Sequence, residues 1–99
     1  MKKKKDVVVT VERVKGYCAA GLKKGDKFVL EGSLISIEKS DKVCGMAFSN
    51  IYPMLFAARL GYSGKDLGYK KWIVQCADPG SPHSDGGTVW FSIEPLKKR

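Results

Sequence analysis

The sequence has no long uninterrupted apolar run, and this absence excludes membrane-spanning proteins. No stretch of the 99 residues approaches the roughly 20 apolar residues that a transmembrane helix requires. Segment 1–14 begins with lysines and continues with alternating charged and apolar residues, so the apolar stretch and small-residue cleavage site of a signal peptide are missing. We therefore expect a cytoplasmic protein.

Cysteine and histidine are scarce, and their spacing excludes the common frameworks built from them. The three cysteines are an odd number, lie far apart and form no C-x-x-C pair, so neither a disulfide scaffold nor a zinc ribbon is indicated. We expect free or metal-bound thiols. The glycine pattern around Gly21 and Gly25 matches neither a P-loop nor a dinucleotide-binding fingerprint and indicates an ordinary turn.

Basic residues outnumber acidic residues, but the excess positive charge is concentrated at the two ends of the chain. The formal net charge is +8, and seven positive charges lie in Lys2–Lys5 and Lys97–Arg99, which leaves +1 for the body between them. Short runs of like charge are usually solvated, so we expect a solubilising role for both. An alternative is a nucleic-acid accessory protein whose basic tails make weak, salt-dependent contacts.

Length and composition predict one folded domain. Apolar residues make up 43% of the chain, an ordinary proportion for a globular protein. We place the domain at residues 7–95, between a basic N-terminal tail, 1–6, and a basic C-terminal tail, 96–99.

Helical spacing occurs in one long stretch, 44–61, where apolar residues recur every three or four positions. Pro53 interrupts it, because proline lacks a backbone N–H and clashes with the preceding turn. We expect either one kinked helix or two short helices, the second capped by Asn50. Gly61 is placed to end the helix in a left-handed conformation.

Five other stretches show the alternation or β-rich composition of strands, separated by turn residues. They are Val7–Val14, Lys27–Glu31, Leu34–Glu38, Lys71–Cys76 and Thr88–Glu94. The order β-β-β-α-β-β predicts an α+β fold, a mixed or antiparallel sheet covered by one helix. Such a sheet can leave one face or edge partly apolar, and an apolar face or edge favours self-association into a homo-oligomer.

Three short motifs carry a resemblance to a known group of proteins. They are Cys18-Ala19-Ala20-Gly21 followed by Gly25-Asp26, Cys44 ahead of Tyr52-Pro53 and Arg59-Leu60-Gly61, and Cys76-Ala77-Asp78-Pro79. Together they resemble a family of small uncharacterised proteins of anaerobic bacteria and archaea. This chain has Leu22, Gly45 and Ala77 where that family tends to have a histidine and two prolines. The resemblance implies domain boundaries and an interest in the cysteines, and no activity.

Each cysteine falls at the boundary of an expected element, where side chains from different parts of a sheet can meet. Cys44 also begins the helix, whose unpaired N–H groups and dipole stabilise a thiolate. If Cys18, Cys44 and Cys76 met, they would offer three soft ligands, and His83 or Asp78 could supply a fourth. Such a site would suit zinc or iron, and soft ligands also suit iron–sulfur or copper(I) chemistry.

Other roles remain open for the same residues. Free cysteines often serve as buried apolar fillers, and Cys76 shares a strand face with Trp72 and Val74. His83 lies in a Pro/Ser/Asp loop, which is typical of a solvated residue. We expect a small binding or accessory protein that holds a metal ion through its cysteines; the alternative is a thiol-based redox enzyme or sensor using Cys44.

Overall fold

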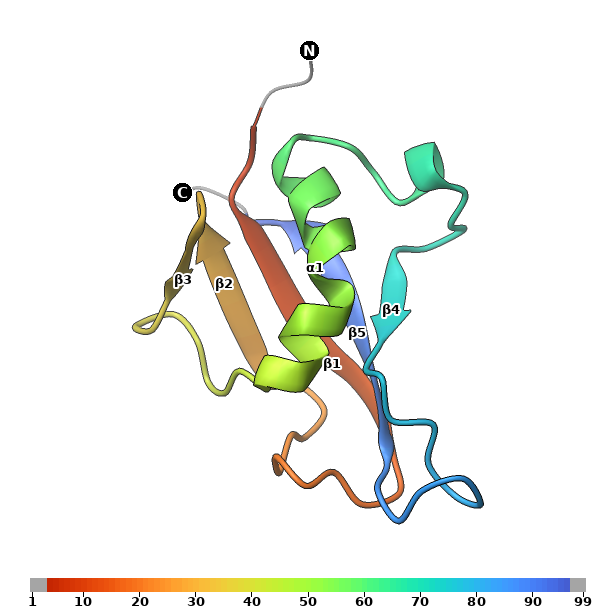
Figure 1. The fold of residues 1–99 in the computed structure, drawn as a ribbon. Helices are drawn as coiled ribbons and strands as arrows, with labels where there is room; N and C mark the ends of the chain where they lie inside the picture. The colour runs from red at the N-terminus through yellow and green to blue at the C-terminus, as the bar shows by residue number, and fades with distance from the viewer. Residues whose placement is uncertain (1–3, 97–99) are drawn as a thin grey trace.

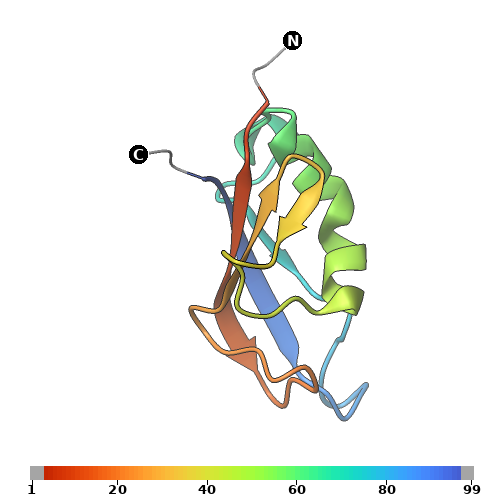
Figure 2. The ribbon, with the colours of Figure 1, turned by 90° about the vertical axis from the view of Figure 1, so that its left-hand side faces the viewer.

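The structure, a computed structural model that describes residues 4–96, is a five-stranded antiparallel sheet with one α-helix packed on one face (Figure 1). The strand order is β3-β2-β1-β5-β4. Within the described residues, the opposite face of the sheet carries no helix (Figure 2). The predicted α+β class is confirmed. The elements are β1 Val7–Lys15, β2 Lys27–Glu31, β3 Leu34–Ser36, α1 Gly45–Arg59, a 3-10 helix Lys65–Leu67, β4 Ile73–Gln75 and β5 Thr88–Pro95.

β1 is the central strand because its alternating valines provide a continuous apolar face. Val7, Val9 and Val11 are buried, whereas the residues between them are only partly buried. Val9 pairs with Phe28 of β2 on one side and with Ile93 of β5 on the other. The three strands therefore present one apolar face to α1.

A β-bulge changes the phase of β1 near its end. Between Val11 and Arg13 the register with β5 shifts, so Glu12 has no partner in the ladder. After the shift Val14 packs against the core, and the Arg13 guanidinium lies 4.7 Å from the centre of the Trp90 ring. Strict alternation would have put Arg13 on the core face. The bulge keeps the charge outside.

α1 runs through Pro53 as one helix, which was one of the two alternatives, and Asn50 does not cap a second helix. Pro53 is exposed, so water can reach the carbonyl that its missing N–H leaves unpaired. The Asn50 side chain instead donates a 2.9 Å hydrogen bond to the Gln75 carbonyl of β4. The helix ends as predicted at Gly61, which has φ +94°. There the Gly61 and Tyr62 amides donate to carbonyls of the last turn, as in a Schellman motif.

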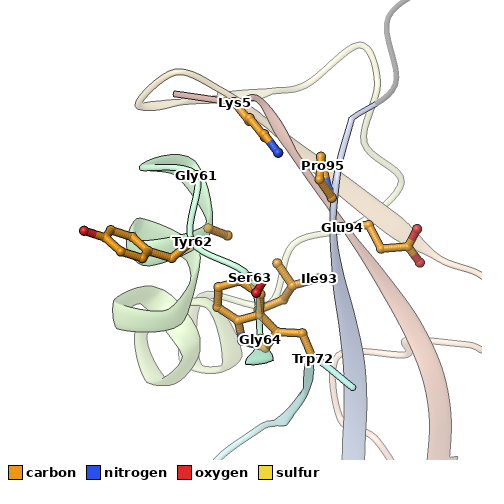
Figure 3. A pocket seen from close by; sticks show the side chains of 10 residues that line it. Lys5, Gly61, Tyr62, Ser63, Gly64, Trp72, Ile93, Glu94 and Pro95 are labelled. Atoms are coloured by element: carbon orange, nitrogen blue, oxygen red, sulfur yellow. The ribbon is translucent and has the colours of Figure 1, made fainter. Parts of the chain in front are cut away.

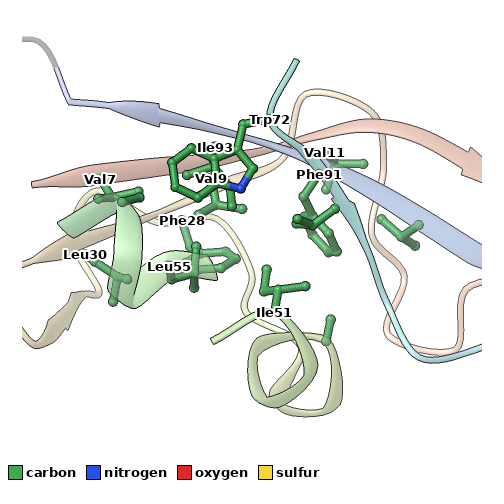
Figure 4. Packing of buried hydrophobic residues seen from close by; sticks show 14 of the residues in the cluster. Val7, Val9, Val11, Phe28, Leu30, Ile51, Leu55, Trp72, Phe91 and Ile93 are labelled. Atoms are coloured by element: carbon green, nitrogen blue, oxygen red, sulfur yellow. The ribbon is translucent and has the colours of Figure 1, made fainter. Parts of the chain in front are cut away.

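The core lies between α1 and the sheet (Figure 4). Ile51 and Leu55 of α1 are completely buried, and the Trp72 indole lies beside Ile93 and Val9. Apolar residues from β1, β2, β5 and α1 and from the segment before β4 complete this layer. They include Val7, Val11, Phe28, Leu30 and Phe91.

The shorter elements differ from the sequence-based expectation at their ends. β3 stops at Ser36, and Ile37, expected in that strand, is 88% exposed. β4 is also shorter than expected, and the loop after α1 contains a 3-10 turn.

Near the N-terminus, the Asp6 carboxylate accepts a 3.0 Å hydrogen bond from the Gly32 amide. Residues 1–3 and 97–99 lie outside the described residues; they include half of the basic run Lys2–Lys5 and all of Lys97–Arg99.

Gly64 permits a close approach between the loop after α1 and the start of β4. A Cβ at this position would lie 2.8 Å from the Cβ of Trp72. We predict that Gly64→Ala lowers the free energy of unfolding by about 1–3 kcal/mol, because the tight contact must be displaced. Urea denaturation followed by tryptophan fluorescence measures this.

The matched control is Gly45→Ala, at the first residue of α1. A Cβ there meets no atom within 4 Å, so stability should be unchanged or slightly higher. Equal stability of the two variants would contradict the packing of Trp72 described here.

Candidate functional site

The three cysteines, distant in sequence, line one cavity at the end of the sheet where α1 begins. In Figure 1 the loop after β1, the start of α1 and the end of β4 lie at this same end. Cys18, Cys44 and Cys76 are each partly buried, and none forms a disulfide. We call this the cysteine cavity. Three separate segments of the chain thus each contribute one cysteine to its wall.

Cys18 reaches the cavity through the turn that ends β1. Gly16, with φ +81°, reverses the chain directly after the strand. The Cys18 carbonyl then accepts a 2.9 Å hydrogen bond from the Gly21 amide, which closes a tight turn. This turn brings Ala19 and Ala20 to the cavity beside Cys18.

Cys44 is the N-cap residue of α1. Its backbone is extended, with φ −84° and ψ 117°, and its carbonyl accepts the first hydrogen bond of the helix, 2.8 Å from the Phe48 nitrogen. Its side chain makes no capping hydrogen bond. The thiol is therefore not engaged in holding the helix end.

Cys76 directly follows β4 and is fixed by the neighbouring strand. Its amide donates to the Val89 carbonyl at 3.0 Å, and the Val89 amide donates to the Cys76 sulfur at 3.3 Å. The thiol lies 3.9 Å from the Gly87 carbonyl oxygen, the distance of a weak S–H···O hydrogen bond. Cys76 is thus more than an apolar filler: its sulfur has defined partners at the cavity wall.

Asp78 also lines the cavity, but its carboxylate holds the loop between β4 and β5 together. It accepts hydrogen bonds from the Ser84 hydroxyl and from the Gly80 amide, the latter at 2.9 Å. These two donors, Ser84 first, lower the pKa of the Asp78 carboxyl below its usual value. The Asp78 carbonyl accepts a further bond from the Thr88 hydroxyl at 2.7 Å.

The cavity is small and mostly apolar. Its volume is about 110 Å³, far below the roughly 300–1,000 Å³ of pockets that hold drug-sized ligands and cofactors. Apart from the sulfurs and Asp78, the wall consists of aliphatic side chains and glycine. Its apolar members are Ala19, Ala20, Leu22, Ala47, Ala77 and Val89. The space suits a single ion or a very small molecule.

The cysteines share the cavity without forming a finished coordination site. Among residues 4–96, no three histidine, cysteine, aspartate or glutamate side chains are grouped closely enough to hold a metal ion. Metal binding would require the three cysteine sulfurs to come closer together than they lie in this structure. As donors, three thiols in an apolar wall fit a soft ion.

His83, considered as a fourth ligand, does not line the cavity. It is exposed in the turn that follows Gly80, and its amide donates a 2.9 Å hydrogen bond to the Gly80 carbonyl. The other suggested ligand, Asp78, lies at the cavity but is already engaged by two donors. The arrangement therefore favours sulfur over nitrogen or oxygen ligands.

Met46 and Gly87 also lie at the cavity, and neither was singled out from the sequence. Met46, in the first turn of α1, lines the cavity although it is 78% exposed. Gly87 also lines it, and a Cβ there would lie 2.5 Å from the Lys15 carbonyl oxygen. For Met46, its position two residues after Cys44 in a helical stretch could have indicated a place at the cavity. The position of Gly87 depends on contact between strand ends, and no local feature of the sequence indicates it.

A second cavity, of about 150 Å³, lies between the end of α1 and β5 (Figure 3). Trp72 and Ile93 form its floor, and Lys5 and Glu94 lie at its rim. Its charged groups are opposite in sign and it contains no cysteine or histidine. It offers no comparable set of reactive side chains.

Comparison with protein-family models, with curated proteins and with solved structures yields no match for this chain. The family resemblance of the cysteine motifs therefore stays a prediction. Within residues 4–96, no helix has both the length and the apolar character needed to cross a bilayer. Function must be inferred from the site itself.

The Asp78 hydrogen bonds predict a pH-dependent contribution to stability. Because folding lowers the pKa of this carboxyl, its contribution is present above the unfolded-state value of about 3.9 and is lost as the pH falls through the lower folded value. Asp78→Asn should therefore destabilise the protein at pH 7, and the difference from the unmodified chain should vanish in acid. Urea unfolding across this pH range measures it.

Asp85→Asn is the matched control, since Asp85 is an exposed carboxyl of the same loop. It should leave stability nearly unchanged at every pH. An Asp78→Asn effect that persisted undiminished below the folded pKa would contradict the proposed role of the Ser84 and Gly80 donors.

Proposed function

We propose that this protein is a small binding protein that captures a soft metal ion with Cys18, Cys44 and Cys76. The observation that supports the proposal is that three free thiols, from three separate segments, line one cavity. Thiolates are preferred ligands of soft and borderline metals, including copper(I) and zinc. Chance burial of apolar thiols would not require them to share a cavity.

The dimensions of the cavity support a single ion rather than an organic substrate. A volume of about 110 Å³ leaves no room for a nucleotide or a similar cofactor. Four cysteines are the usual complement for an iron–sulfur cluster, and only three are present in the chain. Mononuclear binding of zinc, iron(II) or copper(I) is therefore the chemistry that fits the donor set.

The alternative proposal is a thiol-based redox protein that uses Cys44. Two features support it: the position of Cys44 at the start of α1 and the absence of a capping role for its side chain. Partial burial beside two other thiols also allows a disulfide to form after oxidation. The metal proposal is favoured because it uses all three cysteines.

We predict that protein prepared without air contains, or takes up, one soft metal ion per chain. Elemental analysis after desalting, and titration against a competing chelator, measure content and affinity. Each of Cys18→Ser, Cys44→Ser and Cys76→Ser should weaken binding by at least about tenfold, since each removes a sulfur ligand.

His83→Ala is the matched control and should bind as the unmodified chain does, because His83 is exposed and away from the cavity. Absence of stoichiometric binding by the unmodified protein, together with rapid alkylation of Cys44, would overturn the metal proposal and support the redox alternative. If His83→Ala lost as much metal affinity as the cysteine variants, the proposal that the ion binds in the cysteine cavity would be contradicted.

A further inference from the structure

Met46 is an apolar side chain held largely in solvent beside the cysteine cavity. It is 78% exposed, although it belongs to the first turn of α1, whose next residue, Ala47, is buried. Methionine gains little from such exposure, yet it lines the cavity with the three cysteines. The structure thus brings four sulfur-containing side chains to one small space.

Resting on the proposed function, we propose that the Met46 thioether is a fourth sulfur ligand and that the cavity is selective for copper(I). Zinc and copper(I) both bind thiolates, so the thioether is the ligand that discriminates: it suits copper(I), whereas zinc takes imidazole nitrogen or carboxylate oxygen beside thiolates. Neither of those is offered: His83 lies outside the cavity, and the Asp78 carboxylate is engaged by Ser84 and Gly80.

The position and flexibility of Met46 suit this role. Its side chain is unbranched, with three rotatable bonds and a polarizable sulfur, so it can turn from solvent over the cavity. Cys44 is the N-cap residue of α1 and Met46 lies in its first turn, so the two side chains leave the backbone close to the same end of the helix. The aliphatic wall provided by Ala20, Leu22 and Val89 disfavours bound water, which a zinc or iron(II) ion with an incomplete protein ligand set would retain.

The test compares Met46→Leu with the unmodified chain. Leucine keeps the size and apolar character of methionine but has no sulfur, so the fold should be retained. Copper(I) affinity is measured without air against a chromogenic copper(I) chelator, and zinc affinity against a zinc indicator. Met46→Leu should weaken copper(I) binding by at least about tenfold and leave zinc binding unchanged.

Met54→Leu is the matched control, because Met54 lies on the same helix, packs against the core and does not line the cavity. It should bind both metals as the unmodified chain does. Copper-edge X-ray absorption should show four sulfur neighbours in the unmodified protein and three in Met46→Leu.

The outcomes separate this inference from the proposed function. If the cysteine variants lose copper(I) but Met46→Leu binds it normally, the inference is overturned and the three-cysteine site stands. Equal weakening of copper(I) and zinc by Met46→Leu would mean a general effect on the cavity and would also overturn the inference. If the unmodified chain binds neither metal, both proposals fail.

Discussion

The structure depends on the burial of one face of α1 against the valine-rich face of β1 and its neighbours. The helix has weak local signals: its N-cap side chain makes no capping bond, its first turn has no acidic residue, and Pro53 lies inside it. Burying an aliphatic side chain contributes about 1.5–3 kcal/mol, compared with about 1 kcal/mol for a good N-cap. Ile51 and Leu55, both fully buried, therefore do more than capping to hold the helix.

This packing also explains why the three cysteines line one cavity. Ile51 and Leu55 pack against β1 and β5. Because of this packing, the N-terminus of α1 lies at the end of the sheet where the chain leaves β1 and β4. Cys44 is then near the turn that carries Cys18 and the strand end that carries Cys76. Gly87, which has no side chain, allows the ends of β1 and β5 to approach each other closely at the cavity wall.

Much of the fold was predictable from the sequence because the relevant signals are local. Alternation in β1 and β5 and the three- and four-residue spacing in α1 depend on which face each side chain presents, and both gave the correct elements. The single helix through Pro53 was one of two alternatives, and local signals could not decide between them, because packing overrides the local cost of an exposed proline. The bulge at Glu12 likewise arises from keeping Arg13 on the solvent side.

The site was predictable only in part. Element boundaries suggested that the three cysteines could converge, but the sequence could not show that His83 lies outside the cavity or that Asp78 is engaged by Ser84. Those outcomes depend on how the loop between β4 and β5 folds back on itself. The position of Met46 at the cavity depends on the rotation of α1 about its axis, which the core residues set.

The most direct test of the account is whether the three thiols are neighbours in the folded chain. Each of the three single Cys→Ser variants retains two cysteines, and each is treated with a short bifunctional thiol reagent such as dibromobimane, with mass spectrometry of the products. The account predicts that all three pairs are bridged within one molecule when folded, and much less in denaturant. If the cysteine pairs were cross-linked no more efficiently in the folded protein than in denaturant, the shared cavity would be contradicted.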